Sequence, residues 1–128
     1  MTAVGATDDE IAKTREHART MIAFYGSTRT YSPVFEHHGY DGLSDLLHDR
    51  QREGDIAGMT SLISDDILDH YIVTAHWDDL ADALVARYRD LAPSLRLMSY
   101  TAINQYNHDP AVLERWGSVA VQIRDLTK

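Results

Sequence analysis

Strand-forming composition at strand length occurs at only two places in this chain, and this scarcity is the strongest limit on its fold. Residues 71–74 read Tyr-Ile-Val-Thr, and residues 95–99 read Leu-Arg-Leu-Met-Ser. β-Branched and aromatic residues favour strands, and so short an apolar run indicates a buried one. The other segments follow a helical period. We therefore expect a mostly helical chain with about six helices and two short strands.

Helix signals fill the first 70 residues. Thr7 and Glu10 form a capping box that predicts a helix beginning at Asp8, and Gly26 stands where a left-handed C-terminal cap would end it. The same kinds of signal predict four shorter helices: one within residues 27–40 with Pro33 in its first turn and Gly39 at its end, one over residues 43–53 ended by Gly54, one after a cap at Asp55, and one or two turns from Ser64.

The second half of the chain alternates strand and helix. A helix over residues 78–91 separates the two strand candidates, and a last helix begins at Asp109 and Pro110. Its inward face is expected to carry Leu113, Trp116, Ala120 and Ile123. Such βα units place parallel strands side by side, so residues 71–74 and 95–99 are predicted to be parallel neighbours. A two-stranded sheet has two open edges, which indicates the end of something larger.

Charge and composition exclude several classes of function. Twenty acidic residues against twelve Lys and Arg give a net charge of −8, which disfavours nucleic-acid and anionic-membrane partners. The absence of cysteine removes thiolate metal sites and cysteine nucleophiles. No apolar run approaches the roughly 20 residues that span a bilayer, so a cytoplasmic protein without a membrane partner is expected.

The most specific motif is YGSTRTYSPVFEHHG, residues 25–39. With its spacing Y-G-S-T-x-x-Y-x-P-V-x-E-x-H-G, and with residues 67–91 and 95–100, the chain resembles the C-terminal portion of the luciferase-like monooxygenase family. The similarity is to its deazaflavin-dependent (coenzyme F-420) oxidoreductases, and it runs in order over residues 4–116.

The resemblance implies an α/β fold by ancestry, with this chain as the C-terminal part of a TIM-type (β/α)₈ barrel. Residues 1–128 would form a single partial domain. Residues 4–70 would be a helical insertion, and residues 71–128 the last two βα units. A complete barrel of this kind needs about 250 residues, so the first strands would have to come from elsewhere.

The function implied by the resemblance is that of an oxidoreductase or monooxygenase acting on a small organic substrate. Coenzyme F-420 is the implied cofactor, with FMN as the alternative, and it is open whether this chain binds either. The other hypothesis is a non-catalytic remnant, or a split-barrel subunit that needs an N-terminal half-barrel partner or assembles as a homo-oligomer. No catalytic residue is assigned, and the chain alone is expected to be inactive.

The turn at residues 25–28 is the candidate ligand site, because we expect exposed backbone N–H groups and two hydroxyls there. Tyrosine rings nearby would either line a pocket for a flat ring or pack the helices together. The predicted cofactor-contacting residues are Tyr25, Gly26, Ser27, Thr28, Tyr31 and His38.

Two other features of the sequence resemble ligand sites. The pair His37-His38 invites a metal hypothesis, but adjacent helical residues point about 100° apart, and we predict no metal. After the strand at residues 71–74 the resembled family has a Gly-Thr-Pro-Glu-Glu-like turn, whereas this chain has Ala75, His76 and Trp77 before two aspartates. A phosphate contact at that helix start is therefore not expected.

Overall fold

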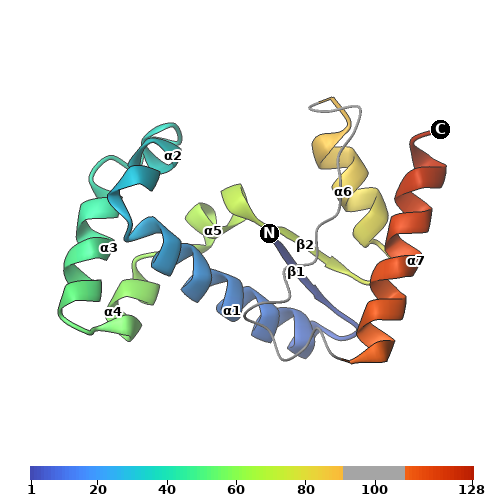
Figure 1. Cartoon of the computed structure of the whole chain (residues 1–128), viewed down its shortest axis with the longest axis horizontal. Coiled ribbons are helices and arrows are strands. Elements are labelled where there is room, and N and C mark those ends of the chain that lie inside the picture. The colour runs from blue at the N-terminus through green and yellow to red at the C-terminus, as the bar shows by residue number, and fades with distance from the viewer. Residues whose placement is uncertain (91–108) are drawn as a thin grey trace. The chain divides into compact units, whose positions relative to one another are not determined.

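The computed structural model describes residues 1–90 and 109–128, which form seven α-helices, one 3-10 turn and two strands (Figure 1). In chain order they are β1 (Thr2–Gly5), α1 (Asp8–Gly26), the 3-10 turn η1 (Arg29–Tyr31), α2 (Ser32–Glu36), α3 (Leu43–Arg52), α4 (Ile56–Ser61), α5 (Asp65–Tyr71), β2 (Val73–His76), α6 (Leu80–Tyr88) and α7 (Pro110–Leu126). The expected strand at residues 95–99 lies outside the described residues.

Polar side chains begin several helices as the sequence predicts. At α1 the Glu10 N–H donates to Thr7 Oγ1 over 3.3 Å, while the Glu10 carboxylate accepts from the Ala6 N–H at 2.6 Å. Asp55 accepts from the first turn of α4 at 2.8 Å, and Ser64 from the first turn of α5 at 3.3 Å. Each cap satisfies a backbone N–H that has no partner inside its helix.

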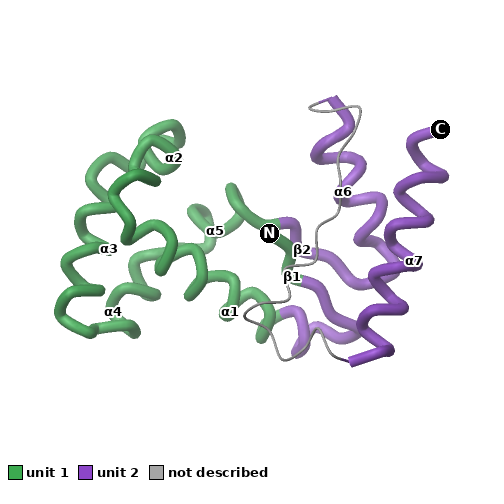
Figure 2. Tube along the Cα trace, in the orientation of Figure 1, with its two compact units in different colours: residues 1–3, 12–72 green, residues 4–11, 73–128 purple. Residues whose placement is uncertain are grey.

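The chain divides into two compact units (Figure 2). Unit 1 consists of residues 1–3 and 12–72, and unit 2 of residues 4–11 and 73–128. The boundary falls inside β1: Ala3 belongs to the core of unit 1, and Val4 packs on the core of unit 2. The prediction of a single partial domain stays a prediction.

The core of unit 1 joins α1 to the short helices that follow it. α2 packs against α3, and α3 against α4. Leu47 and Leu68 are fully buried, and Phe35 is 3% exposed. The other buried apolar residues of this core are Ala3, Ala18, Ile22, Ala23, Leu43, Met59, Ile63, Ile67 and Ile72. Burial on this scale supplies the main driving force for folding of the unit.

Unit 2 contains the paired parts of β1 and β2, with α6 packed on β2 and on α7. The strands run parallel (Figure 1), and the Trp77 N–H extends the pairing by donating to the Gly5 carbonyl over 3.2 Å. The buried apolar residues of this core are Val73, Leu80, Ala81, Leu84 and Val119.

The expectation of a TIM-type barrel part is wrong for this structure. Among residues 1–90 and 109–128 there are two short parallel strands in a mainly helical chain, and they form a two-stranded sheet. The partner of β2 is β1, a strand that the sequence analysis did not predict. Residue 71 ends α5, and the strand begins only at Val73. A four-residue strand whose partner lies 70 residues away leaves almost no local signal.

The inward face of α7 is rotated from its predicted position. Val119 is buried, and Trp116 and Ile123 pack partly buried on the same core. Leu113, however, is 47% exposed, and Ala120 is exposed as well. The buried position is Val119 rather than the neighbouring Ala120, because the packing partner of α7 decides which side of the helix is covered.

Gly26 ends α1 as predicted, but for a different physical reason than the predicted left-handed cap. Positive φ angles occur at Gly39, Gly42 and Gly54, not at Gly26. A Cβ on Gly26 would lie 2.6 Å from the Phe35 ring and 2.8 Å from Leu47 Cδ1. The glycine is required by close packing rather than by a left-handed backbone.

Gly26→Ala should therefore destabilise the protein by roughly 1–3 kcal/mol, because the added methyl overpacks a well-filled core. Gly117→Ala is the matched control, since an added Cβ there meets nothing within 4 Å in the middle of α7. It should stabilise by about 0.5–1 kcal/mol. Urea unfolding of both variants checks the pair, and equal effects would show that Gly26 is not held by packing.

Candidate functional site

Three aromatic side chains are exposed around the end of α1. Phe24, Tyr25 and Tyr31 are 49%, 37% and 45% exposed. Tyr25 meets both others edge to face, with ring centroids 5.8 Å from Phe24 and 6.2 Å from Tyr31. Exposed rings of this size are unusual unless they serve packing or binding. We call these three residues the aromatic surface.

The turn beside the aromatic surface uses most of its donors internally. The N–H of Ser27 donates to the Ala23 carbonyl and that of Thr28 to the Tyr25 carbonyl, both over 3.0 Å. Ser27 is fully buried, and its Oγ donates to the Phe24 carbonyl at 2.6 Å. The expectation of exposed N–H donors is therefore not met at these two residues. Thr28 is exposed and its side chain makes no cap hydrogen bond.

Two side chains of α3 contact the backbone carbonyls of the same turn. Ser44, buried, donates from Oγ to the Gly26 carbonyl at 2.7 Å. One turn later, His48 Nδ1 lies 3.1 Å from the Ser27 carbonyl, so this nitrogen carries the proton. The spacing of four residues puts both groups on one face of α3. Gly26 and Ser27 thus act first as a joint between α1 and α3.

His38 lies in a second aromatic group at the end of α2. Its ring stacks on that of His70 from α5, with centroids 4.0 Å apart and planes 23° apart. His37 and Tyr71 meet His38 edge to face at 5.0 and 5.7 Å, and Tyr40 meets His70 at 5.8 Å. The structure thus brings Tyr25 and Tyr31 together, whereas the ring contacts of His38 are with a different set of residues.

The environment of this second group shifts two pKa values. Desolvation, followed by the charges of His70 and His37, lowers the pKa of His38 below its ordinary value. Burial, with a smaller contribution from Tyr40, raises the pKa of Tyr71. Tyr71 therefore keeps its proton at neutral pH and donates it to the Val34 carbonyl over 2.9 Å.

A network of charges, which the sequence analysis did not single out, lies between α1 and α5 in unit 1. Arg15 contacts Asp65 at 3.2 Å and Asp69 at 2.8 Å, and Arg19 contacts Asp65 at 2.5 Å and Glu16 at 3.1 Å. Arg19 also donates to the Ile63 carbonyl. One feature of the sequence could have predicted this network. Arg15 and Arg19 are four residues apart on one helix, and so are Asp65 and Asp69, so each pair lies on one helix face.

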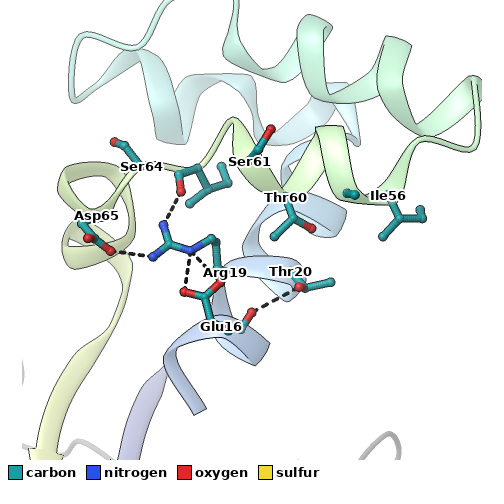
Figure 3. Close-up of a pocket in the computed structure, with 10 residues that line it drawn as sticks. Glu16, Arg19, Thr20, Ile56, Thr60, Ser61, Ser64 and Asp65 are labelled. Atoms are coloured by element: carbon teal, nitrogen blue, oxygen red, sulfur yellow. Dashed lines mark hydrogen bonds and ion pairs between the residues drawn. The ribbon is translucent and has the colours of Figure 1, made fainter. Parts of the chain in front are cut away.

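Arg19 and Asp65 also line an open depression of about 890 Å³ (Figure 3). Figure 3 shows the Arg19 guanidinium directed toward Glu16 and Asp65, and the same group donates to the Ile63 carbonyl. Hydrogen bonds from Arg19 and Arg15 lower the pKa of the Asp65 carboxyl. Since the guanidinium of Arg19 already has three partners, this depression offers no free cation to an anionic ligand.

An exposed histidine–carboxylate contact lies at the carboxyl end of β2. His76 Nε2 lies 3.1 Å from Asp8 Oδ1, and Asp8 is 96% exposed. Contacts this exposed contribute little to stability. The neighbouring Trp77 packs instead with Trp116, edge to face at 5.2 Å, and Arg115 lies 5.7 Å above its ring. Trp77 therefore serves the core of unit 2.

Within residues 1–90 and 109–128, no group of three His, Cys, Asp or Glu side chains is placed to hold a metal ion. Among the helices that the structure describes, none is both long enough and apolar enough to cross a membrane.

The comparisons with known proteins give relatives without an assigned role. The uncharacterized protein Rv1360 of Mycobacterium tuberculosis and the uncharacterized protein Mb1395 of Mycobacterium bovis are each 40% identical to this chain over 84 residues. The match covers 66% of the chain and 25% of each relative, which makes the relatives about 340 residues long, since 84 residues are a quarter of them. The chain spans about a quarter of the length of the curated relatives it matches.

No protein-family model matches the chain, and no solved structure matches it. Membership of the luciferase-like family, the cofactor, the partners and the cytoplasmic location therefore stay predictions. The six predicted cofactor-contacting residues also stay predictions as ligand contacts, and the geometry above separates the exposed Tyr25, Thr28, Tyr31 and His38 from the buried Gly26 and Ser27.

Ser27→Ala should lower the free energy of unfolding by about 1 kcal/mol, because it removes a buried hydrogen bond to a backbone carbonyl. Thr28→Ala is the matched control one residue away, and its exposed hydroxyl should contribute less than about 0.5 kcal/mol. Thermal and urea unfolding of both variants measure the difference. If the Ser27→Ala protein is as stable as the wild type, the Ser27 hydroxyl does not contribute to folding, and this prediction is wrong.

Asp65→Asn should reduce the loss of stability in acid. Because the folded pKa of Asp65 is lowered, its contribution is present above the ordinary value of about 3.8 and is lost as the pH falls through the folded value. The variant lacks this contribution at every pH, so its unfolding midpoint should be lower at neutral pH and fall less on acidification. Asp66→Asn, also exposed in the first turn of α5, should keep the wild-type profile.

Proposed function

We propose that this chain is a C-terminal piece of a luciferase-like, deazaflavin-dependent oxidoreductase or monooxygenase that acts on a small organic substrate. The observation that carries the proposal is the exposed pair Tyr25–Tyr31, since both tyrosines belong to the Y-G-S-T-x-x-Y spacing that the resemblance rests on. A flat ring system can lie against exposed tyrosine faces, and tyrosine hydroxyls add donors at the rim. When bound, the deazaflavin would supply the hydride chemistry, and the protein its orientation.

The residues present fit the planar ring of such a coenzyme better than its phosphate. The aromatic surface is suited to a planar ring, and the Thr28 hydroxyl lies exposed next to it. The N–H groups of Ser27 and Thr28 are already donated within the chain, so they do not supply a cradle for a phosphate. Coenzyme F-420 is our first candidate for the ring, and FMN, whose ring is also planar, is the second.

A second candidate is a non-catalytic piece or subunit that works only with an N-terminal partner chain or a second copy of itself. The chain spans about a quarter of its relatives, and the sheet formed by residues 2–5 and 73–76 has two strands among the described residues. Two-stranded sheets are marginal on their own. On this proposal the isolated chain binds no coenzyme.

A chimera tests both proposals. The stretch of the Mycobacterium tuberculosis relative that this chain matches is replaced by the whole of this chain. The chimera is titrated with coenzyme F-420 and, separately, with FMN, following the coenzyme's fluorescence. We expect the chimera to bind F-420 and the isolated chain to bind neither. Tyr25→Ala and Tyr31→Ala in the chimera should each weaken binding about tenfold, the equivalent of about 1.4 kcal/mol.

The control is Leu46→Ala, which removes a similarly exposed apolar side chain, 56% exposed on α3, outside the aromatic surface. Its affinity should equal that of the unmodified chimera. A folded chimera that binds neither coenzyme contradicts the enzyme proposal. Binding of F-420 by the isolated chain contradicts the proposal that a partner is needed, and unchanged affinity after both tyrosine replacements removes the aromatic surface from the site.

A further inference from the structure

The stacked rings of His38 and His70 join two segments that are far apart in sequence. His38 follows α2, and His70 lies in the last turn of α5. Their centroids are 4.0 Å apart with nearly parallel planes, and both residues are exposed. Neutral imidazoles pack well in this arrangement. Two imidazolium rings at the same distance repel each other, since each then carries a full positive charge.

Backbone hydrogen bonds join the segment that His38 begins to α2, and the partly buried Tyr40 ring packs on the core of unit 1. The His38 and Gly39 N–H groups each donate to a carbonyl of α2 over 2.9 Å, and the Tyr40 N–H reaches the Phe35 carbonyl at 3.1 Å. Gly39 and Gly42 have φ angles of 82° and 77°, and an added Cβ at either would meet nothing within 4 Å. Residues 38–42 are thus a turn with open space around its two glycines.

α2 itself has an anchor that does not depend on the histidines. Phe35 is buried and meets the Tyr71 ring edge to face at 5.5 Å, and the Tyr71 hydroxyl donates to the Val34 carbonyl. Because the pKa of Tyr71 is raised, this hydrogen bond is unaffected between pH 5 and 8. A change at the histidine stack is therefore confined to the turn that follows α2.

We propose that the His38–His70 stack is a pH-sensitive latch, which holds residues 38–42 against the end of α5 while both rings are neutral and releases them when both rings are protonated. The inference does not depend on the proposed function. Its basis is the stacked geometry of the two rings, which joins the turn after α2 to the last turn of α5.

The groups around the stack favour the neutral form of the rings, which is consistent with release on acidification. Among the described residues, His37 meets it from the end of α2, Tyr40 from the turn and Tyr71 from α5. Desolvation lowers the pKa of His38 most, and the charges of His70 and His37, both cationic when protonated, lower it further. A lowered pKa means that the unfolded chain binds more protons, so the latch stabilises above about pH 6.5 and its contribution is lost as the pH falls below that value.

Nuclear magnetic resonance of the full chain tests the latch. The ring signals of the histidines are followed from about pH 8 to about pH 5, a range that spans the ordinary histidine pKa, and His38→Gln and His70→Gln assign them. We expect a nuclear Overhauser contact between the two rings at the upper end, its loss at the lower end, and a His38 titration midpoint below 6.5. In His70→Gln the midpoint of His38 should rise toward 6.5.

Amide exchange of residues 39–42, corrected for its intrinsic pH dependence, gives the conformational readout. It should become severalfold faster on acidification in the wild type and show no such step in either His38→Gln or His70→Gln. His17→Gln is the control, because His17 is exposed on α1 without a ring partner among the described contacts; it should leave the titration and the exchange unchanged. A ring contact that persists when both rings are protonated, or an unchanged His38 midpoint in His70→Gln, overturns the proposal.

Discussion

The close approach of Phe35 and Leu47 to Gly26 is the contact on which unit 1 depends. The missing Cβ lets a ring and a leucine reach the backbone at the end of α1, where a methyl group would lie within 2.8 Å of both. The same point is reinforced from α3, because Ser44 and His48 contact the carbonyls of Gly26 and Ser27. One backbone position thereby sets how three helices meet.

The Y-G-S-T turn contains two buried and two exposed residues. Gly26 and Ser27 are the two buried members of the Y-G-S-T turn, and both are occupied by packing and internal hydrogen bonds. Tyr25 and Thr28 are the exposed ones. A motif of this kind can therefore mark a joint between helices as much as a ligand site, and its exposed positions are the ones that could contact a ligand.

Local features were predicted well, and non-local ones were not. The start of α1 at Asp8 and the caps at Asp55 and Ser64 follow from side chains within four residues of the groups they satisfy, so the sequence alone reveals them. The pairing of β1 with β2 and the stacking of His70 on His38 join residues more than 30 positions apart. Neither has a periodic signal, because what brings the partners together is the packing of the helices between them.

The division of the chain inside β1 has a consequence for anyone who wishes to cut the protein into parts. Each unit is built from two separate stretches: residues 1–3 with 12–72, and residues 4–11 with 73–128. Cleavage after Ile72 would leave the C-terminal piece without Val4 and without the strand that pairs with β2. No single cut yields either unit whole, so separating them calls for a circularly permuted gene or for mixing two complementary peptides.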